Sequence, residues 1–340
     1  MQNDYYKGLR SYYLTVAICL VVIAALFLIS LFTGRYMIEP EEVIAFIENK
    51  EIPELSGRII TKLRIPRTII ALFTGASLAV SGAIYQGVFN NRMASPDLLG
   101  VSSGASLGAC IGILMDLSFE KIVIASFAAG NLTVCITVMI AKLIGKQTEF
   151  SLILSGIATG GLMSSCIGLT KYLADDERKL SEITYWLLGS FSSSTMKEAA
   201  FISPVLTICF MICLLSVNTI DIISLGKKEA KVSGVNYNMS VLILISCATL
   251  MTASCVSVSG VIGWVGLTVP NLVRLVFGNM HRKVLMLSML LGIVFMMLTD
   301  MLARTLSPDE IPLSVITGII GTPLFLFSVI GRRKRDKVLQ

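Results

Sequence analysis

The sequence predicts an all-α, polytopic membrane protein of about ten transmembrane helices. Hydrophobic residues make up 54% of its 340 residues and charged residues only 15%, whereas a soluble domain carries roughly 25% charged residues. Apolar runs recur along the whole chain, and many reach the roughly 20 residues that a spanning helix needs. Because the stretches between them leave no room for a soluble domain, we expect one transmembrane domain over residues 1–340.

Ten apolar segments are the candidate spans: Tyr12–Phe32, Ile69–Phe89, Leu98–Leu114, Ile122–Ala141, Leu152–Thr170, Ala199–Ile220, Val241–Val258, Val261–Val273, Val284–Thr299 and Ile311–Ile330. The seventh and eighth follow each other without a charge between them, and we place their boundary at the glycines Gly260, Gly263 and Gly266. In the acidic segment after the first span, Pro40 predicts the start of a short helix, Glu41–Asn49.

The basic residues predict the orientation of the chain. With a cytoplasmic N-terminus, most of the 28 Lys and Arg residues fall on the inner side and most of the 22 Asp and Glu residues on the outer side, as the positive-inside bias requires. An even number of spans then places the basic tail, residues 331–340, in the cytoplasm with the N-terminal residues 1–11. The net charge of +6 is therefore interpreted as a topology signal, and no nucleic-acid partner is expected.

A short polar segment, residues 221–238, separates two long apolar runs near the middle of the bundle 12–330. Its apolar residues are spaced as in a short amphipathic helix, and Gly234 suits the positive φ that ends one. A helix this short is marginal alone in water, so it needs a surface to lie on. A solvated connector and a ledge that contacts a partner protein both fit these residues.

Polar residues near the span ends are candidates for specific contacts. Arg64 and Arg67 lie three residues apart at the outer edge of the second span, where lipid headgroups or a carboxylate of an outside partner could compensate them. Asp300 and Arg304 are spaced to pair on one helical face. His281, the single histidine, stands beside two basic residues and is expected in a solvated loop.

Motifs for catalysis or energy conversion are missing from the sequence. It lacks the phosphate-binding loop that ends in Gly-Lys-Ser/Thr, and its eight cysteines all fall within candidate spans, where we interpret them as packing residues. No catalytic residue, metal site or cofactor is expected, so the driving force should come from another subunit. The fifth span carries small hydroxylated residues, including Ser155 and Thr159, which are typical of a helix that packs centrally or lines a pathway.

Several motifs in register resemble one family. They are LRIPRTIIALFTGASLAVSGAIYQGVFNN from Leu63, SPDLLGVSSGASLG from Ser95, WLLGSFS from Trp186, ISLGKKEAKVSGV from Ile223, GVIGWVGLTVPNLVRLVFG from Gly260, and LTDMLAR with EIPLSVITGIIGTPLFLFSVIGR, from Leu298 to Arg332. This run resembles the permease subunits of ATP-binding-cassette (ABC) importers for iron–siderophore complexes, haem and cobalamin, the FecCD-type family.

The resemblance implies a type II ABC importer permease fold in a bacterial cell membrane. It implies a dimer with an identical or homologous permease, two ATPase subunits on the cytoplasmic side and a substrate-binding protein outside. Ile223–Tyr237 would then be the segment that couples to the ATPase, and the residues that match the family there are Leu225, Gly226, Glu229, Ala230 and Gly234.

The same resemblance implies roles for the other candidate residues. Arg64, Arg67 and Arg304 would contact acidic residues of the binding protein. The fifth and tenth spans would line the pathway, with Ser155 and Thr159 on the fifth. The turn before the fifth span would form the cytoplasmic gate through Thr148, Glu149 and Phe150.

Three classes of function are compared with the sequence. A ferric siderophore is the favoured cargo of an ABC importer, with cobalamin or haem as alternatives. An ion-coupled secondary transporter would explain the spans and the charge bias, but not the segment 221–238. A membrane-embedded enzyme lacks a nucleophile with its base.

Overall fold

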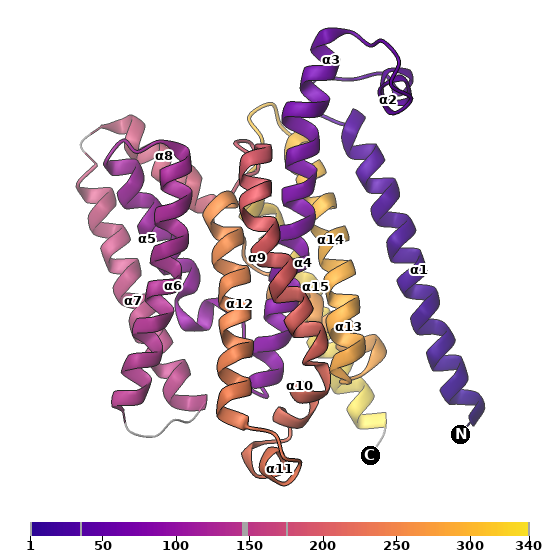
Figure 1. Ribbon diagram of the computed structural model, residues 1–340, viewed down its shortest axis with the longest axis vertical. Coiled ribbons are helices and arrows are strands. Elements are labelled where there is room, and N and C mark those ends of the chain that lie inside the picture. The colour runs from indigo at the N-terminus through magenta and orange to yellow at the C-terminus, as the bar shows by residue number, and fades with distance from the viewer. Residues whose placement is uncertain (1, 35, 145–148, 175, 339–340) are drawn as a thin grey trace.

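The computed structural model describes residues 2–34, 36–144, 149–174 and 176–338, and Figure 1 shows a bundle of long, roughly parallel helices. The elements of its first half are α1 (Gln2–Phe32), α2 (Pro40–Ile47), α3 (Glu54–Ile59), the π-helical turn η1 (Ile60–Arg64), α4 (Ile65–Val88), the 3-10 turn η2 (Pro96–Leu99), α5 (Val101–Leu114), α6 (Phe119–Leu143) and α7 (Glu149–Tyr172). Those of the second half are α8 (Glu177–Leu188), α9 (Met196–Leu215), α10 (Val217–Ile223), α11 (Lys227–Val232), α12 (Tyr237–Ser259), α13 (Val265–Phe277), α14 (His281–Thr305) and α15 (Leu313–Val338).

Each of the ten predicted spans corresponds to a helix of the described chain. Eight helices are long and apolar enough to cross a membrane, and α5 and α13 are shorter apolar helices. The predicted break between the seventh and eighth spans is present, because α12 ends at Ser259 and α13 begins at Val265. Gly260 with φ 68° and Trp264 with φ 70° reverse the backbone there. The short helix after Pro40 is α2.

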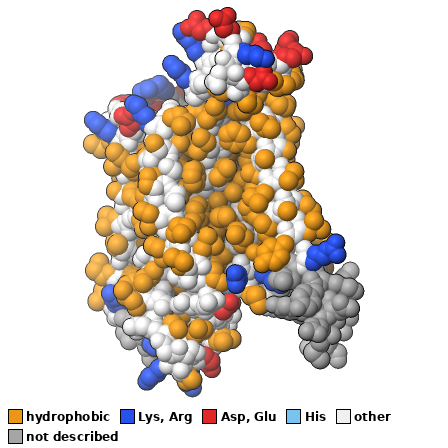
Figure 2. Space-filling model, turned by 45° about the vertical axis from the view of Figure 1, so that its right-hand side comes forward, with side chains coloured by type: hydrophobic (Ala, Val, Ile, Leu, Met, Phe, Trp, Pro, Cys, Tyr) orange, Lys and Arg blue, Asp and Glu red, His pale blue; other side chains and the backbone are white. Residues whose placement is uncertain are grey.

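The two ends of the bundle differ. Figure 1 places α2 and α3 at one end, called the α3 end below, and α11 with both chain termini at the other, called the α11 end. On the face drawn in Figure 2, a belt of apolar side chains lies between the charged groups of the two ends. This distribution is the one that a bilayer selects, since charged side chains are costly in its hydrocarbon core.

Helix α4 is the centre of the bundle. In the most apolar 18-residue stretch of Glu54–Val88, 83% of the residues are buried, against 22% in the corresponding stretch of the N-terminal span, Arg10–Phe32. Two glycines of α4 allow this, because a Cβ at Gly75 would overlap the backbone of Gly292 in α14, and a Cβ at Gly82 would overlap the backbone of Gly266 in α13. Small residues let helix backbones approach closely where lipid gives no hydrophobic drive to associate.

A second set of close contacts joins α5, α6 and α7. The seam Gly100, Gly104 and Gly108 begins at the 3-10 turn η2, where Gly100 takes φ 76°, and continues along α5. A Cβ at Gly104 would collide with Thr133 of α6, and one at Gly108 would lie 2.5 Å from the Ala125 carbonyl oxygen of the same helix. The small residues of this seam therefore allow α5 to pack tightly against α6.

Candidate functional site

The predicted coupling segment lies at the α11 end of the bundle as two short helices. After α9 the chain turns at Ser216 into α10, which buries Val217, Ile220 and Ile223 against α4 and α14. Two more residues lead to Gly226, which has φ 112° and immediately precedes α11. Figure 1 shows α11 projecting beyond the ends of the long helices.

Backbone geometry accounts for both ends of α11. At its start, Gly226 adopts a positive φ that L side chains rarely tolerate, and a Cβ there would lie 3.2 Å from Glu229 Oε2. At its end, Gly234 has φ 73°, its N–H bonds the Lys231 carbonyl at 3.2 Å, and the Val235 N–H bonds the Ala230 carbonyl at 2.9 Å. This pair of bonds around a left-handed glycine is a Schellman cap.

The side chains of α11 divide into an anchored side and an open side. Ala230 is fully buried and holds the helix against the bundle, whereas Val232 at the end of α11 is 90% exposed and Leu225, two residues before the helix, is 69% exposed. The charged residues Lys227, Lys228, Glu229 and Lys231 are also exposed. Two large apolar side chains displayed on a polar ledge are typical of a surface that a partner protein covers.

A buried histidine connects this ledge to α14. Asp221 Oδ1 accepts a hydrogen bond from the backbone N–H of His281 at 3.0 Å. The same oxygen lies 2.6 Å from His281 Nδ1. His281 is only 4% exposed, so the expectation of a solvated loop position is wrong. Gly87 of α4 makes room for the ring, because a Cβ there would lie 2.6 Å from His281 Nε2. The contact thus joins α10 to the first turn of α14 and, by packing, to the last turn of α4.

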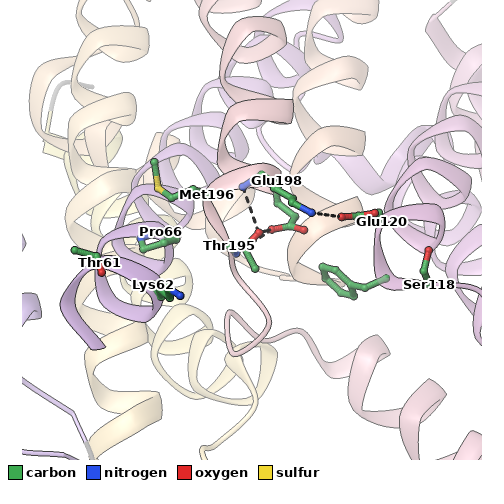
Figure 3. Close-up of a pocket in the computed structure, with 10 residues that line it drawn as sticks. Thr61, Lys62, Pro66, Ser118, Glu120, Thr195, Met196 and Glu198 are labelled. Atoms are coloured by element: carbon green, nitrogen blue, oxygen red, sulfur yellow. Dashed lines mark hydrogen bonds and ion pairs between the residues drawn. The ribbon is translucent and has the colours of Figure 1, made fainter. Parts of the chain in front are cut away.

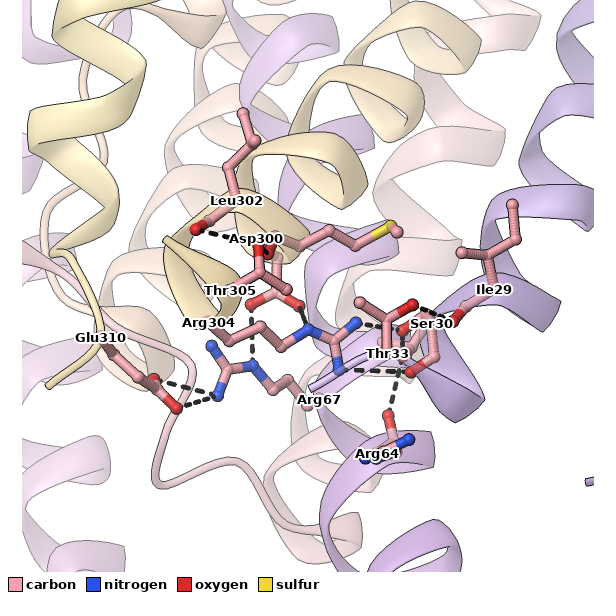
Figure 4. Close-up of polar contacts among 12 residues, drawn as sticks. Ile29, Ser30, Thr33, Arg64, Arg67, Asp300, Leu302, Arg304, Thr305 and Glu310 are labelled. Carbon is pink, nitrogen blue, oxygen red and sulfur yellow. Dashed lines mark hydrogen bonds and ion pairs between the residues drawn. The ribbon is translucent and has the colours of Figure 1, made fainter. Parts of the chain in front are cut away.

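The three arginines predicted to contact a binding protein lie at the α3 end, and Figure 4 shows their surroundings. Their exposed fractions are only 5% for Arg64, 9% for Arg67 and 5% for Arg304. Arg67 Nε donates to Asp300 at 2.7 Å, and its Nη1 donates to both carboxylate oxygens of Glu310 at 3.0 and 3.1 Å.

The other two arginines are also satisfied inside the chain. Arg304 donates to Ser30 Oγ at 2.7 Å and pairs with Asp300 at 3.5 Å, as their i,i+4 spacing predicts. Arg64 donates to the carbonyls of Leu31 and Tyr36. Arg67 and Arg304 thus have carboxylate partners within the chain, whereas Arg64 donates to carbonyl oxygens, and the docking role of the three arginines stays a prediction.

An open cavity of about 650 Å³ also lies at the α3 end, between the start of α4 and the starts of α6 and α9. Figure 3 shows Glu120 and the pair Thr195–Glu198 with hydrogen bonds, and Thr61, Lys62 and Ser118 without a marked contact among the residues drawn. Glu120 accepts from Lys197 at 2.8 Å, and Glu198 forms a capping box with Thr195 at the start of α9. These contacts hold the first turns of α6 and α9 in place.

Helix α8 closes the same end over the α5–α6 turn. Lys179 and Arg178 both donate to Asp116, Arg178 at a distance of 3.3 Å. The hydrogen bond from Lys179 holds the pKa of Asp116 below its usual value. Within the part of the chain that the structure describes, no three His, Cys, Asp or Glu side chains converge as metal ligands.

The predicted gate and pathway residues are only partly described. Thr148 lies outside the described residues, as does the side chain of Glu149, while Phe150 is 72% exposed at the start of α7. Ser155 and Thr159 are buried: Thr159 Oγ1 lies 2.6 Å from Thr137 Oγ1 of α6, and Ser155 donates to the Ser151 carbonyl. Their hydroxyls therefore serve helix packing within this chain.

Comparison with known proteins identifies the family. The FecCD transport family matches residues 20–331. This chain belongs to the FecCD transport family. It is 35% identical over 310 residues to the molybdate import system permease protein MolB of Haemophilus influenzae, covering 90% of this chain and 91% of MolB. It is 33% identical to an iron chelatin transport system permease protein of Helicobacter pylori, covering 96% and 99% of the two chains.

A solved structure agrees with these relatives. A chain from an inward-facing metal-chelate type ABC transporter superposes with a TM-score of 0.83 at 33% identity, covering 93% of this FecCD chain and 98% of that one. The chain is thus an integral membrane permease subunit of an ABC importer. The polar segment that the sequence predicted forms α10 and α11, and α11 projects beyond the long helices at its end of this FecCD permease.

Sequence reasoning missed two contacts of this FecCD permease that connect distant parts of the chain. The Asp221–His281 contact spans 60 residues, and the Arg67–Asp300 ion pair spans 233. A short-range signal existed for neither, since a single histidine gives no spacing pattern and the i,i+4 spacing of Asp300 points only to Arg304. The burial of His281 could have been suspected only from the small residue Gly87 across the bundle.

Proposed function

We propose that this permease imports a metal chelate, driven by ATP hydrolysis in two partner ATPase subunits, with a ferric siderophore as the favoured cargo. The observation that carries the proposal is the α11 ledge: it is anchored by Ala230, exposes Leu225 and Val232, and is tied to the bundle through Asp221 and His281. The α11 end then lies in the cytoplasm with both termini, as the positive-inside bias predicts, and the membrane is that of a bacterial cell.

In this proposal the ATPase moves the ledge and the ledge moves the bundle. Leu225 and Glu229 would form the surface that an ATPase holds, Gly226 and Gly234 the two backbone turns on either side of α11, and the buried Ala230 would anchor the helix to the bundle. A push on α11 reaches α10, and α10 packs on α4 and α14. Because α4 and α14 are in backbone contact at Gly75 and Gly292, they move as one body, and their far ends carry Arg67, Asp300 and Arg304.

The α3 end would meet the binding protein that delivers the cargo. Since Arg64, Arg67 and Arg304 are buried, we propose that they act by fixing the shape of this surface. Arg67 holds Glu310, which is 22% exposed, in the loop before α15. The docking surface would thus consist of the loops that these arginines position.

The pathway would lie between two copies of the permease. In the most apolar 18-residue stretch of α7, only 17% of the residues are buried. This helix nevertheless carries small residues that suit a helix–helix interface. Its exposed positions include Ile157, Gly161 and Leu162. We propose a homodimer, or a pair with a homologous permease, in which Phe150, with Thr148 and Glu149, forms the gate and Ser155 and Thr159 support the lining helix from behind.

The names of the relatives point to two classes of cargo. The Helicobacter pylori relative is named for iron chelatin and the Haemophilus influenzae relative for molybdate, so family membership alone leaves both classes. Cobalamin and haem are the other chelates to test. An ion-coupled carrier would need an ionisable group free to bind the coupling ion, yet Asp300 is paired with Arg67 and Arg304.

The proposal is tested by uptake in reconstituted vesicles that contain the permease, its ATPase and its binding protein. Ferric siderophore, haem, cobalamin and molybdate are compared as labelled cargo. We expect uptake of a chelate that requires internal ATP. Uptake of molybdate alone would overturn the chelate assignment, and uptake without ATP would overturn the coupling.

A further inference from the structure

A second cavity, of about 870 Å³, lies at the α11 end between helices that diverge there. It is formed by the last turns of α4 and α6 and the first turns of α7 and α12, with α11 beside its mouth. In Figure 1, α6 and α12 run side by side, and α11 lies below α12. Lys227 of the coupling segment and Phe150, proposed above as part of the gate, both line this cavity.

The inner walls of this cavity are apolar. They include Val88, Phe89, Val138, Val241, Leu242 and Ile245. From Asn236 at the mouth to Ile245 on the wall, nine residues of α12 rise about 13.5 Å along the helix axis. An apolar recess of this depth at the edge of the membrane fits the first part of an acyl chain, which gains free energy in proportion to the apolar area it buries.

The mouth of the cavity is basic and polar. Lys142 from the last turn of α6 and Lys227 from the first turn of α11 both line it, together with Asn236 and Asn238. Both lysines are exposed, and among the described lining residues there is no Asp or Glu. Two ammonium groups and two amides at the membrane edge form a site that favours a negatively charged, hydrogen-bonding headgroup.

We propose that this cavity binds an anionic phospholipid, with its phosphate between Lys142 and Lys227 and an acyl chain along Val138 and Val241. The two halves of the cavity select this ligand together. A free phosphate would leave the apolar walls uncovered, and a neutral phospholipid would leave the two cations without a counter-charge. An acidic peptide would place backbone amides against apolar walls that offer them no hydrogen bonds.

The lipid would also act on the ledge. Lys227 is the first residue of α11, and Lys142 belongs to a different helix, so one phosphate held by both connects α11 to α6. The position of α11 would then depend on the charge of the surrounding bilayer. This inference goes beyond the transport function, and its test does not depend on the cargo or on the ATPase.

The test counts bound phospholipids by native mass spectrometry of the purified full chain. Phosphatidylglycerol, phosphatidylcholine and inorganic phosphate are added separately to wild type and to the double variant K142Q/K227Q. The control is K228Q/K231Q, which removes two cations from the same short helix but not from the lining of the cavity. Since each lysine contributes on the order of 1 kcal/mol toward an anionic headgroup, we expect about thirty-fold weaker phosphatidylglycerol binding in K142Q/K227Q and little change in the control.

A second variant tests the apolar half without touching the charges. Val241→Phe narrows the cavity and should also weaken phosphatidylglycerol binding, while the thermal transition of the lipid-free chain stays near that of wild type. Equal binding of phosphatidylcholine, equal loss in both double variants, full binding in Val241→Phe, or displacement of the lipid by inorganic phosphate would each overturn the proposal.

Discussion

Asp221 Oδ1 lies 2.6 Å from Nδ1 of His281 and accepts the backbone N–H of the same residue, so α10 is attached to the first turn of α14. This is the contact through which movement of the exposed ledge would reach the bundle. It joins a partly exposed carboxylate to a buried imidazole. The geometry therefore makes a specific prediction about coupling.

Asp221→Ala should reduce ATP-driven uptake while the ATPase still binds. The variant leaves the His281 nitrogen unsatisfied, which costs about 1–3 kcal/mol for a buried polar group, and frees α10 from α14. Asp221→Asn should keep most of the uptake, since its side-chain oxygen still accepts the His281 hydrogen bonds. Uptake and ATPase pull-down are measured on both variants, and equal uptake in Asp221→Ala and wild type would contradict this role.

The backbone turn at Gly226 should tolerate no bulky side chain. Its φ of 112° and ψ of 171° lie in a region that is essentially restricted to glycine and costs an L residue about 1–3 kcal/mol, and a side chain would also crowd Glu229. Gly226→Val should therefore weaken ATPase binding and ATP-dependent uptake, as should the charge reversal Glu229→Lys. Gly278→Ala is the matched control, because Gly278 also has a positive φ, of 81°, but a Cβ there would meet nothing within 4 Å. Wild-type ATPase binding in Gly226→Val would remove the turn from the docking surface.

Arg67→Ala should destabilise the α3 end of the bundle. The substitution leaves Asp300 buried with only the longer contact to Arg304, and breaking a buried ion pair typically costs 3–5 kcal/mol. We expect a clear fall in the thermal transition, measured in detergent. Arg178→Ala, which removes an exposed pair with Asp116 at the same end, should change the transition little. Similar transitions for both variants would show that the Arg67 network is not structural.

Docking of the binding protein should depend on the shape and charge of the α3 end. The double variant Arg64→Glu with Arg67→Glu should weaken binding-protein association, and Glu310→Gln should weaken it less, because only the loop contact is lost. Association is measured at low and high salt, since the exposed charges of the loops that the arginines position are screened beyond about 10 Å at 0.1 M salt. Unchanged, salt-independent association would remove the arginines from docking.

Two glycines should separate packing within the chain from packing between copies. Gly75→Leu places a side chain into the backbone of Gly292 and should lower both yield and thermal stability. Gly161→Leu sits on the exposed face of α7 with nothing within 4 Å, so it should leave the single chain stable and shift the dimer toward monomer. Size-exclusion chromatography with light scattering measures both, and an unaffected dimer in Gly161→Leu would exclude this part of α7 from the interface.

The sequence predicted the helices well because their signals are local. Apolar runs located every span, Gly260 marked the break between α12 and α13, and Gly234 marked the end of α11. Polar contacts between distant helices were not predictable in the same way. Arg64 and Arg67 looked like exposed charges from their position at a span end, yet Asp300 and Glu310, which pair with Arg67, are brought there only by the packing of α14 and the following loop on α4. His281 was misplaced for the same reason, since its partner Asp221 belongs to another helix.

We propose that this permease cannot drive transport by itself and that ATP hydrolysis in its partner subunits drives it through α11. The most direct measurement reconstitutes the purified chain in sealed vesicles, with and without its ATPase, and follows uptake of a ferric siderophore under an imposed proton or sodium gradient. We predict no accumulation from the gradient alone, and accumulation once the ATPase, the binding protein and ATP are supplied. Accumulation by the permease alone under an ion gradient would contradict the account.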